Sequence, residues 1–117
     1  MVRGRVVGTG SYLPANLLTN DALAQRMDTS DEWIRTRSGI QTRYYASDGE
    51  GSAALGTAAA RAALQSAGRK PEDIDAVVFA TMTPDHLFPG NGPFLQRDLG
   101  LRTIPTFDIR QQCSGFL

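Results

Sequence analysis

Apolar positions along the chain fall into short runs separated by glycine, proline and polar residues. Residues 74–81 form a nearly continuous β-prone apolar run, which is typical of a strand buried on both faces of a parallel sheet. Residues 104–109 predict a further strand, and Val6 and Val7 predict a short strand that runs into the glycine-rich turn 8–14. The hydrophobic pattern therefore predicts three strands.

Helices are predicted between these runs. The alanine-rich stretch 52–67 is followed by Gly68, where a left-handed helix end is expected, and its small side chains would let neighbouring elements approach closely. Residues 94–99 predict a short helix closed by Gly100. Because helices and strands alternate along the chain, we expect an α/β fold with the helix over 52–67 lying between layers.

Two shorter helices are predicted nearer the amino terminus. Asn20 is a suitable cap for a helix over 21–26. Thr29 begins an S/T-x-x-E capping box that ends at Glu32, and the helix that it starts carries Trp33 and Arg37 on one face.

Composition narrows the function classes. The 117 residues are 41% hydrophobic and 21% charged, which is typical of one folded domain or a piece of one. Twelve basic residues balance twelve acidic ones, so nucleic acid is not an expected partner. The sequence has no apolar run long enough for a membrane span, and it predicts neither a signal peptide nor a metal site. A single cysteine fits a reducing cytoplasm.

The chemistry of the chain is predicted to lie at Cys113. The strand over 104–109 leads through a polar turn, 110–112, to this cysteine, and Gly115 follows it. We expect this arrangement to place the thiol at the start of a helix, where the helix dipole stabilises a thiolate and nearby amides bind an oxyanion. From the residues alone, the alternative is that Cys113 is a small buried apolar residue.

The segment around Cys113 resembles the active-cysteine segment of the ketoacyl-ACP synthase III family. Other segments resemble the same family in the same order: Gly8-Thr9-Gly10-Ser11-Tyr12-Leu13-Pro14, Asp28-Thr29-Ser30-Asp31-Glu32-Trp33-Ile34, Thr36-Arg37-Ser38-Gly39-Ile40, and Ala80-Thr81 with His86, Phe88 and Pro89. The resemblance implies a thiolase-like fold with αβαβα layers built from two similar halves. Residues 1–117 would supply most of the first half only, and the second half would be absent.

The resemblance also implies an acyltransferase. In the family, the cysteine takes an acyl group from acyl-CoA, and the carbanion from decarboxylated malonyl-ACP then attacks this thioester to give a 3-oxoacyl-ACP for fatty-acid synthesis. Coenzyme A is then part of the substrate and not a cofactor. The implied partners are an acyl carrier protein, a second copy in a homodimer and the missing second half, which would belong to the same polypeptide or to a separate chain that completes the site. Decarboxylation relies on a histidine and an asparagine of the second half, so residues 1–117 alone are expected to be inactive.

The resemblance gives four further residues a role. Trp33 and Arg37 match positions that hold the adenine of CoA, Thr29 matches a position that also contacts CoA, and Phe88 matches a position at the dimer interface that borders the partner's acyl pocket. Each role has a structural alternative: Trp33 would be core, Arg37 a solvated charge, Thr29 a helix cap and Phe88 simple loop packing. The lone His86 receives no role.

The segment around Cys113 also departs from the family pattern, and other functions therefore stay open. The turn 110–112 replaces small alanines with an arginine and two glutamines, and Ser114 replaces an alanine. These changes leave the acyl primer undefined and are compatible with polyketide, quinolone or olefin pathways. A relative of hydroxymethylglutaryl-CoA synthase, or a noncatalytic fragment that binds CoA or a partner chain, are further alternatives.

Overall fold

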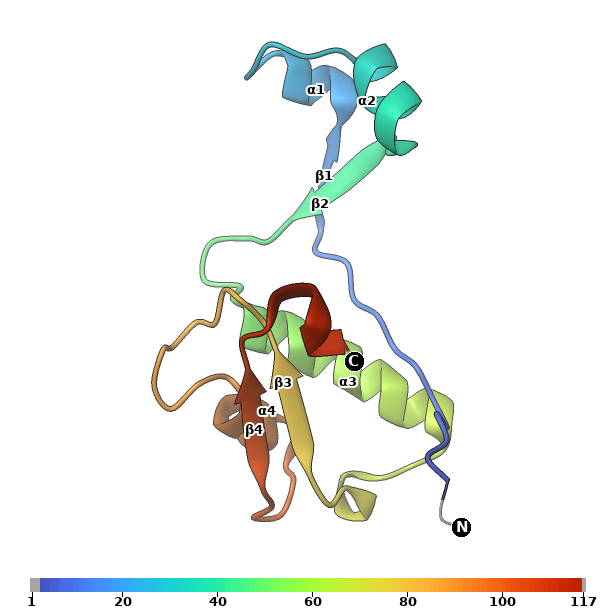
Figure 1. Ribbon diagram of the computed structural model, residues 1–117. Helices are drawn as coiled ribbons and strands as arrows, with labels where there is room; N and C mark the ends of the chain where they lie inside the picture. The colour runs from blue at the N-terminus through green and yellow to red at the C-terminus, as the bar shows by residue number, and fades with distance from the viewer. Residues whose placement is uncertain (1–2, 117) are drawn as a thin grey trace. The chain divides into compact units, whose positions relative to one another are not determined.

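The computed structural model describes residues 3–116, which form two compact units (Figure 1). The smaller unit contains residues 13–49, and the larger unit combines residues 3–12 with residues 50–116. Both helices and strands are present, as the hydrophobic pattern predicts. Leu117, through which the helix expected to start at the thiol would continue, lies outside the described residues.

The smaller unit is a two-stranded antiparallel sheet with two helices in the connection between its strands. Its elements in chain order are β1 (Asn16–Thr19), α1 (Asn20–Ala24), α2 (Asp31–Ser38) and β2 (Thr42–Tyr45). Leu18, Leu23 and Ile34 form its buried apolar cluster. One residue from β1 and one from each helix therefore hold the sheet and the helices together.

Both helices of the smaller unit begin one residue away from the predicted position. Thr19, and not Asn20, caps α1 by accepting a hydrogen bond from the amide three residues later. Ser30, and not Thr29, caps α2 in the same way. A cap needs an extended backbone as well as a side-chain oxygen, and where neighbouring residues both carry an oxygen the sequence does not decide which one adopts it.

The larger unit contains a parallel strand pair connected by a helix. Its elements are α3 (Ser52–Ala67), the short 3-10 helix η1 (Pro71–Asp73), β3 (Val77–Ala80), α4 (Gly92–Leu99), β4 (Thr106–Ile109) and the 3-10 helix η2 (Gln112–Phe116). The pairing runs in parallel from Val77 with Thr106 to Ala80 with Ile109. The predicted α3 is confirmed at both ends, with Gly68 in the left-handed conformation that ends it. The predicted parallel sheet is also confirmed.

The prediction that the strand over 74–81 is buried on both faces is wrong for these residues. Along β3, half-buried and exposed positions alternate, and Val78 is 60% exposed. Phe79 lies on the opposite face, where its ring approaches Gly56 of α3. Within the part of the chain that the structure describes, β3 thus has one covered face and one open face, whereas a continuous apolar run predicts two covered faces.

The amino-terminal segment runs along α3 without forming a strand. Val6 and Val7 are exposed, and neither two-stranded sheet of the described chain includes them, so the strand predicted there is wrong. Gly8 and Gly10 lie so close to α3 that a Cβ atom at either position would collide with backbone atoms of Ala63. These glycines therefore permit close contact between backbones.

Candidate active site

Cys113 lies in the short turn that follows β4. It is a free, exposed cysteine in the 3-10 helix η2, so the alternative that it is a buried apolar residue does not describe this chain. Gln112, the residue before it, has a φ of 45°, a left-handed conformation that is uncommon outside glycine. The Ser114 amide donates to the Gln111 carbonyl at 3.0 Å. The chain therefore turns sharply at the thiol.

The helix expected to start at Cys113 is, within the described residues, a 3-10 helix of five residues. The macrodipole of an α-helix arises from many aligned peptide units, and so short a segment supplies few of them. The dipole argument for a thiolate is therefore weaker in this structure than the sequence indicates. The exposure of Cys113 and the pocket around it are instead the features that indicate a reactive thiol.

An open pocket surrounds the thiol at the carboxyl ends of the two parallel strands. Its volume is about 740 Å³, and its lining comes from β3, β4 and η2: Val78, Ala80, Ile109, Gln112, Cys113, Ser114, Gly115 and Phe116. Gly115 lies against the end of β3, where an added Cβ would be 3.1 Å from the Cβ of Ala80. In open α/β sheets this edge is the usual place for a ligand.

A loop of residues 81–91 connects β3 to α4 beside this pocket, and a carboxylate from β4 holds its far end. Asp108 accepts hydrogen bonds from the Asn91 amide at 2.6 Å and from the Gly92 amide at 3.0 Å. Asn91 is the residue that precedes α4 and Gly92 is its first residue, and helices leave backbone donors without partners at this end. Asp108 therefore caps α4 from outside the helix.

Asp85, in the same loop, caps α3 in a similar way. Its carboxylate accepts from the amides of Ser52 and Ala53, at 2.7 and 2.8 Å, and from the Ser52 hydroxyl. Asn91 connects the two caps, because its completely buried side chain donates to the Ser52 hydroxyl at 2.7 Å and accepts from the Asp85 amide at 3.0 Å. Sequence reasoning identified this stretch only as a loop, because these contacts join residues 6 to 39 positions apart.

These hydrogen bonds give the stability of the larger unit a predictable pH dependence. Desolvation alone would raise the pKa of Asp85, but the hydrogen bonds from Ala53 and Ser52 outweigh it and hold this pKa below its ordinary value of 3.8. The stabilisation is present above pH 3.8 and is lost as the pH falls through the folded-state pKa. Unfolding midpoints measured in urea between about pH 5 and pH 2 should therefore fall less steeply for Asp85→Asn than for wild type. Equal slopes would contradict this interpretation.

The tip of the loop is apolar and exposed. Phe88 is 92% exposed, so simple loop packing does not account for it in this chain. His86 stacks on Phe94 with ring centroids 4.5 Å apart, which gives the lone histidine a packing role. On the side of β4, the Arg110 guanidinium donates to the Leu87 carbonyl at 2.7 Å.

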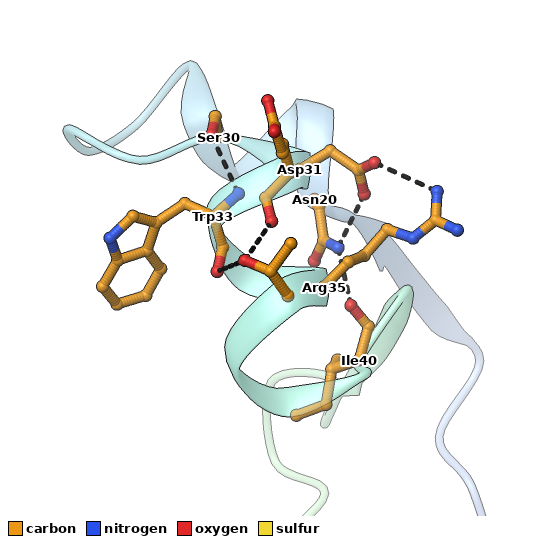
Figure 2. Close-up of polar contacts among 8 residues, drawn as sticks. Asn20, Ser30, Asp31, Trp33, Arg35 and Ile40 are labelled. Carbon is orange, nitrogen blue, oxygen red and sulfur yellow. Dashed lines mark hydrogen bonds and ion pairs between the residues drawn. The ribbon is translucent and has the colours of Figure 1, made fainter.

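In the smaller unit, Trp33 and Arg37 form a stacked pair on α2. The guanidinium carbon of Arg37 lies 4.5 Å from the centre of the indole, and Trp33 is 54% exposed. Trp33 is thus not a core residue here, and the structure brings together two of the three predicted CoA-binding side chains. Figure 2 shows the indole pointing away from the polar contacts that the neighbouring residues make. Thr29 is half-buried just before the cap of α2.

A buried asparagine holds this pair's helix in position. Asn20 is 1% exposed and donates to Asp31 at the start of α2 and to the carbonyl of Ile40 beyond its end (Figure 2). Arg43 donates to the Asn20 side-chain oxygen at 3.0 Å, and Arg35 pairs with Asp31. Of the basic residues around α2, Arg37 is thus the one that lies over the indole.

Within residues 3–116, no group of three or more histidine, cysteine, aspartate or glutamate side chains is arranged to hold a metal ion. No helix in the same residues has the length and hydrophobicity that crossing a membrane requires.

Comparison with known proteins finds relatives that carry similar names. No protein-family model matches the chain. The chain is 50% identical over its full 117 residues to beta-ketoacyl-[acyl-carrier-protein] synthase III of Rhizobium meliloti strain 1021, of which it covers 36%. A crystal structure of 3-oxoacyl-[acyl-carrier-protein] synthase III from Aquifex aeolicus VF5 is similar with a TM-score of 0.87 and 44% identity, over 94% of this chain and 35% of that one.

A crystal structure of the priming β-ketosynthase of the R1128 polyketide pathway is similar with a TM-score of 0.89 and 38% identity, over 96% of this chain and 34% of that one. The chain therefore spans about a third of the length of the relatives that it matches. The predicted fold class, an α/β chain of the thiolase-like kind, is confirmed by these structures.

Proposed function

We propose that this chain, which matches the amino-terminal third of β-ketoacyl-ACP synthase III, supplies the acyl-accepting cysteine of such a condensing enzyme. The observation that carries the proposal is the exposed thiol of Cys113 in an open pocket at the carboxyl ends of β3 and β4. An attacking sulfur needs access to a bound thioester, and this position gives it. Intact-mass measurement of the acylated protein tests the proposal.

The first step is transfer of an acyl group to sulfur. The Cys113 thiolate attacks the thioester carbonyl of acyl-CoA, a new carbon–sulfur bond forms, and the bond to the CoA sulfur breaks. CoA leaves as a thiolate and takes up the proton that Cys113 has lost. Backbone amides beside the thiol would supply the donors to the oxyanion, apart from the Ser114 amide, which donates to the Gln111 carbonyl.

The second step requires residues outside this chain. Malonyl-ACP loses carbon dioxide, its carbanion attacks the acyl-Cys113 carbonyl, and the sulfur of Cys113 leaves as the 3-oxoacyl-ACP forms. The residues that assist decarboxylation belong to the second half of the family's fold. We therefore assign residues 1–117 to the first half and expect activity only in the complete polypeptide, with an acyl carrier protein as partner in the cytoplasm.

The identities favour fatty-acid initiation over a specialised pathway. The chain is 50% identical to the Rhizobium synthase III and 38% identical to the polyketide priming enzyme, over almost the same residues.

The exposed Phe88 supports the assignment of the tip of the loop 81–91 to a homodimer interface. An aromatic side chain that is 92% exposed is typical of a surface that a partner covers.

Trp33 and Arg37 are proposed to bind the adenine of CoA, with Thr29 beside them. Arg37 covers one face of the exposed indole, and a purine would stack on the remaining surface. Trp33→Ala should weaken CoA binding by about tenfold in equilibrium titration, since an aromatic platform contributes on the order of 1–3 kcal/mol to stacking of a base.

Two comparisons sharpen this experiment. Trp33→Phe keeps a ring and should lose less affinity than Trp33→Ala, whereas Tyr45→Ala removes an exposed aromatic residue from β2 and should bind CoA as wild type does. Equal CoA affinity in wild type and Trp33→Ala would remove Trp33 from the binding site.

A further inference from the structure

The segment that carries the thiol is attached to the neighbouring loop by one arginine. Arg110 lies between β4 and η2, three positions before Cys113, and its guanidinium donates to the Leu87 carbonyl across 23 positions of sequence. A hydrogen bond from a charged donor is stronger than one between neutral groups. This contact therefore joins the turn of Cys113 to the tip of the loop 81–91.

The loop is itself anchored at both ends, as a support would need to be. Asp85 holds its first part to the start of α3, Asp108 holds its last part to β4, and the buried Asn91 connects the two. Between these anchors the tip has few contacts of its own, since Leu87 and Phe88 are exposed. The Arg110 contact with the Leu87 carbonyl is thus made to a loop whose two ends are fixed.

The turn of Cys113 has little other support. Gln112 has a left-handed backbone, the Ser114 amide closes the turn on Gln111, and Gly115 approaches Ala80. The remaining residues of the turn are largely exposed. A strained turn at a functional site keeps its shape only when its surroundings fix it.

We propose that the loop 81–91 supports the turn that carries Cys113 and that Arg110 is the positioning residue that joins the loop to this turn. The proposal rests on the proposed function of Cys113 and adds a specific role for the arginine that departs from the family's small residues. Arg110 is not among the residues that line the pocket of Cys113. It fixes the direction from which the thiolate meets the carbonyl, so its loss slows acyl transfer without weakening substrate binding.

The test uses the complete polypeptide that contains this chain, with Arg110→Met and Arg110→Lys. Arg110→Met should accelerate amide exchange in the peptide 111–116 by about tenfold, and it should lower the maximal rate of Cys113 acylation by acetyl-CoA by about tenfold. The half-saturating concentration of acetyl-CoA should stay within about twofold of wild type. Arg110→Lys keeps a charged donor and should recover most of the lost rate.

Arg61→Met is the matched control. Arg61 also donates to a backbone carbonyl, that of Asp98, but it connects α3 to the end of α4 and not to the turn. This variant should leave both exchange at 111–116 and acylation unchanged. Alkylation of Cys113 by iodoacetamide, which needs no oriented thioester, should be similar in all variants.

The outcomes separate the two proposals. The positioning role would be overturned if wild type is acylated and Arg110→Met has the same maximal rate. It would also be overturned if Arg110→Met changes only the half-saturating concentration. Either result would leave Cys113 as the nucleophile. A wild type that acetyl-CoA does not acylate would overturn the proposed function. In that case amide exchange in the peptide 111–116 still tests the role of the loop: faster exchange in Arg110→Met would support it, and unchanged exchange would overturn it.

Discussion

Cys113→Ser in the complete polypeptide is expected to abolish acylation by acetyl-CoA. Wild type should gain the mass of one acetyl group on a peptide that contains Cys113, and the variant should gain none. A serine hydroxyl at the same position is a far weaker nucleophile without an adjacent base, so the acylation rate should fall by about 10³-fold or more. Intact-mass spectrometry over a time course, followed by peptide mapping, measures both quantities.

Ser114→Ala provides the control for this substitution. Ser114 lies beside the thiol in the same pocket, and the variant removes its hydroxyl while leaving the thiol in place. It should acylate at a rate close to that of wild type. Equal acylation of wild type and Cys113→Ser would show that the acyl group is carried elsewhere or is not transferred at all.

Asn91→Ala should produce a large loss of stability in the larger unit. The buried side chain makes one hydrogen bond to the Ser52 hydroxyl and one to the Asp85 amide. Its removal leaves the Asp85 amide without this acceptor, takes one of several hydrogen bonds from the Ser52 hydroxyl, and leaves a cavity between the amino ends of α3 and α4. We expect the free energy of unfolding to fall by about 2–4 kcal/mol, measured by urea denaturation followed by circular dichroism.

Gln65→Ala is a suitable comparison, because Gln65 is an exposed residue of α3 whose replacement shortens the side chain without exposing a buried group. Its effect should be about 0.5 kcal/mol or less. An Asn91→Ala protein as stable as Gln65→Ala would mean that the two capping carboxylates hold the helices without the asparagine between them.

Local signals in the sequence predict the helices and the parallel strands of the larger unit well, but they do not predict the antiparallel strands β1 and β2 of the smaller unit. The helix α3 follows from an alanine-rich run with Gly68 after it, and α4 is likewise closed by a left-handed Gly100. The strands β3 and β4 follow from apolar, β-prone runs, and their parallel pairing follows from the helix between them. Each of these predictions depends on residues that are neighbours in sequence.

Features that depend on distant partners were predicted poorly. Val6 and Val7 have strand-forming side chains, but a strand also needs a partner, and the described residues offer none. Asp85 and Asp108 look like ordinary loop and strand residues until the fold brings them to the ends of α3 and α4. Position along the chain does not indicate such pairs.

In the candidate site, too, the sequence predicts what depends on neighbouring residues and misses what depends on distant ones. Cys113 was identified because its neighbours resemble those of a known family, and the structure adds its exposure and its pocket. The stacking of Arg37 on Trp33 follows from helical spacing, since residues four apart share a face. The Arg110 contact had no signal in the sequence except an unusual residue in place of a small one.

The external capping of α3 has a consequence for the order of events during synthesis. The first amides of this helix receive their acceptor from Asp85, which leaves the ribosome after the whole of α3 and 33 positions after Ser52. Until then the nascent helix begins with unpaired backbone donors and frays at that end. The amino end of α3 is thus fully capped only after residue 85 has been synthesised, so completion of this helix depends on a segment that lies downstream of it.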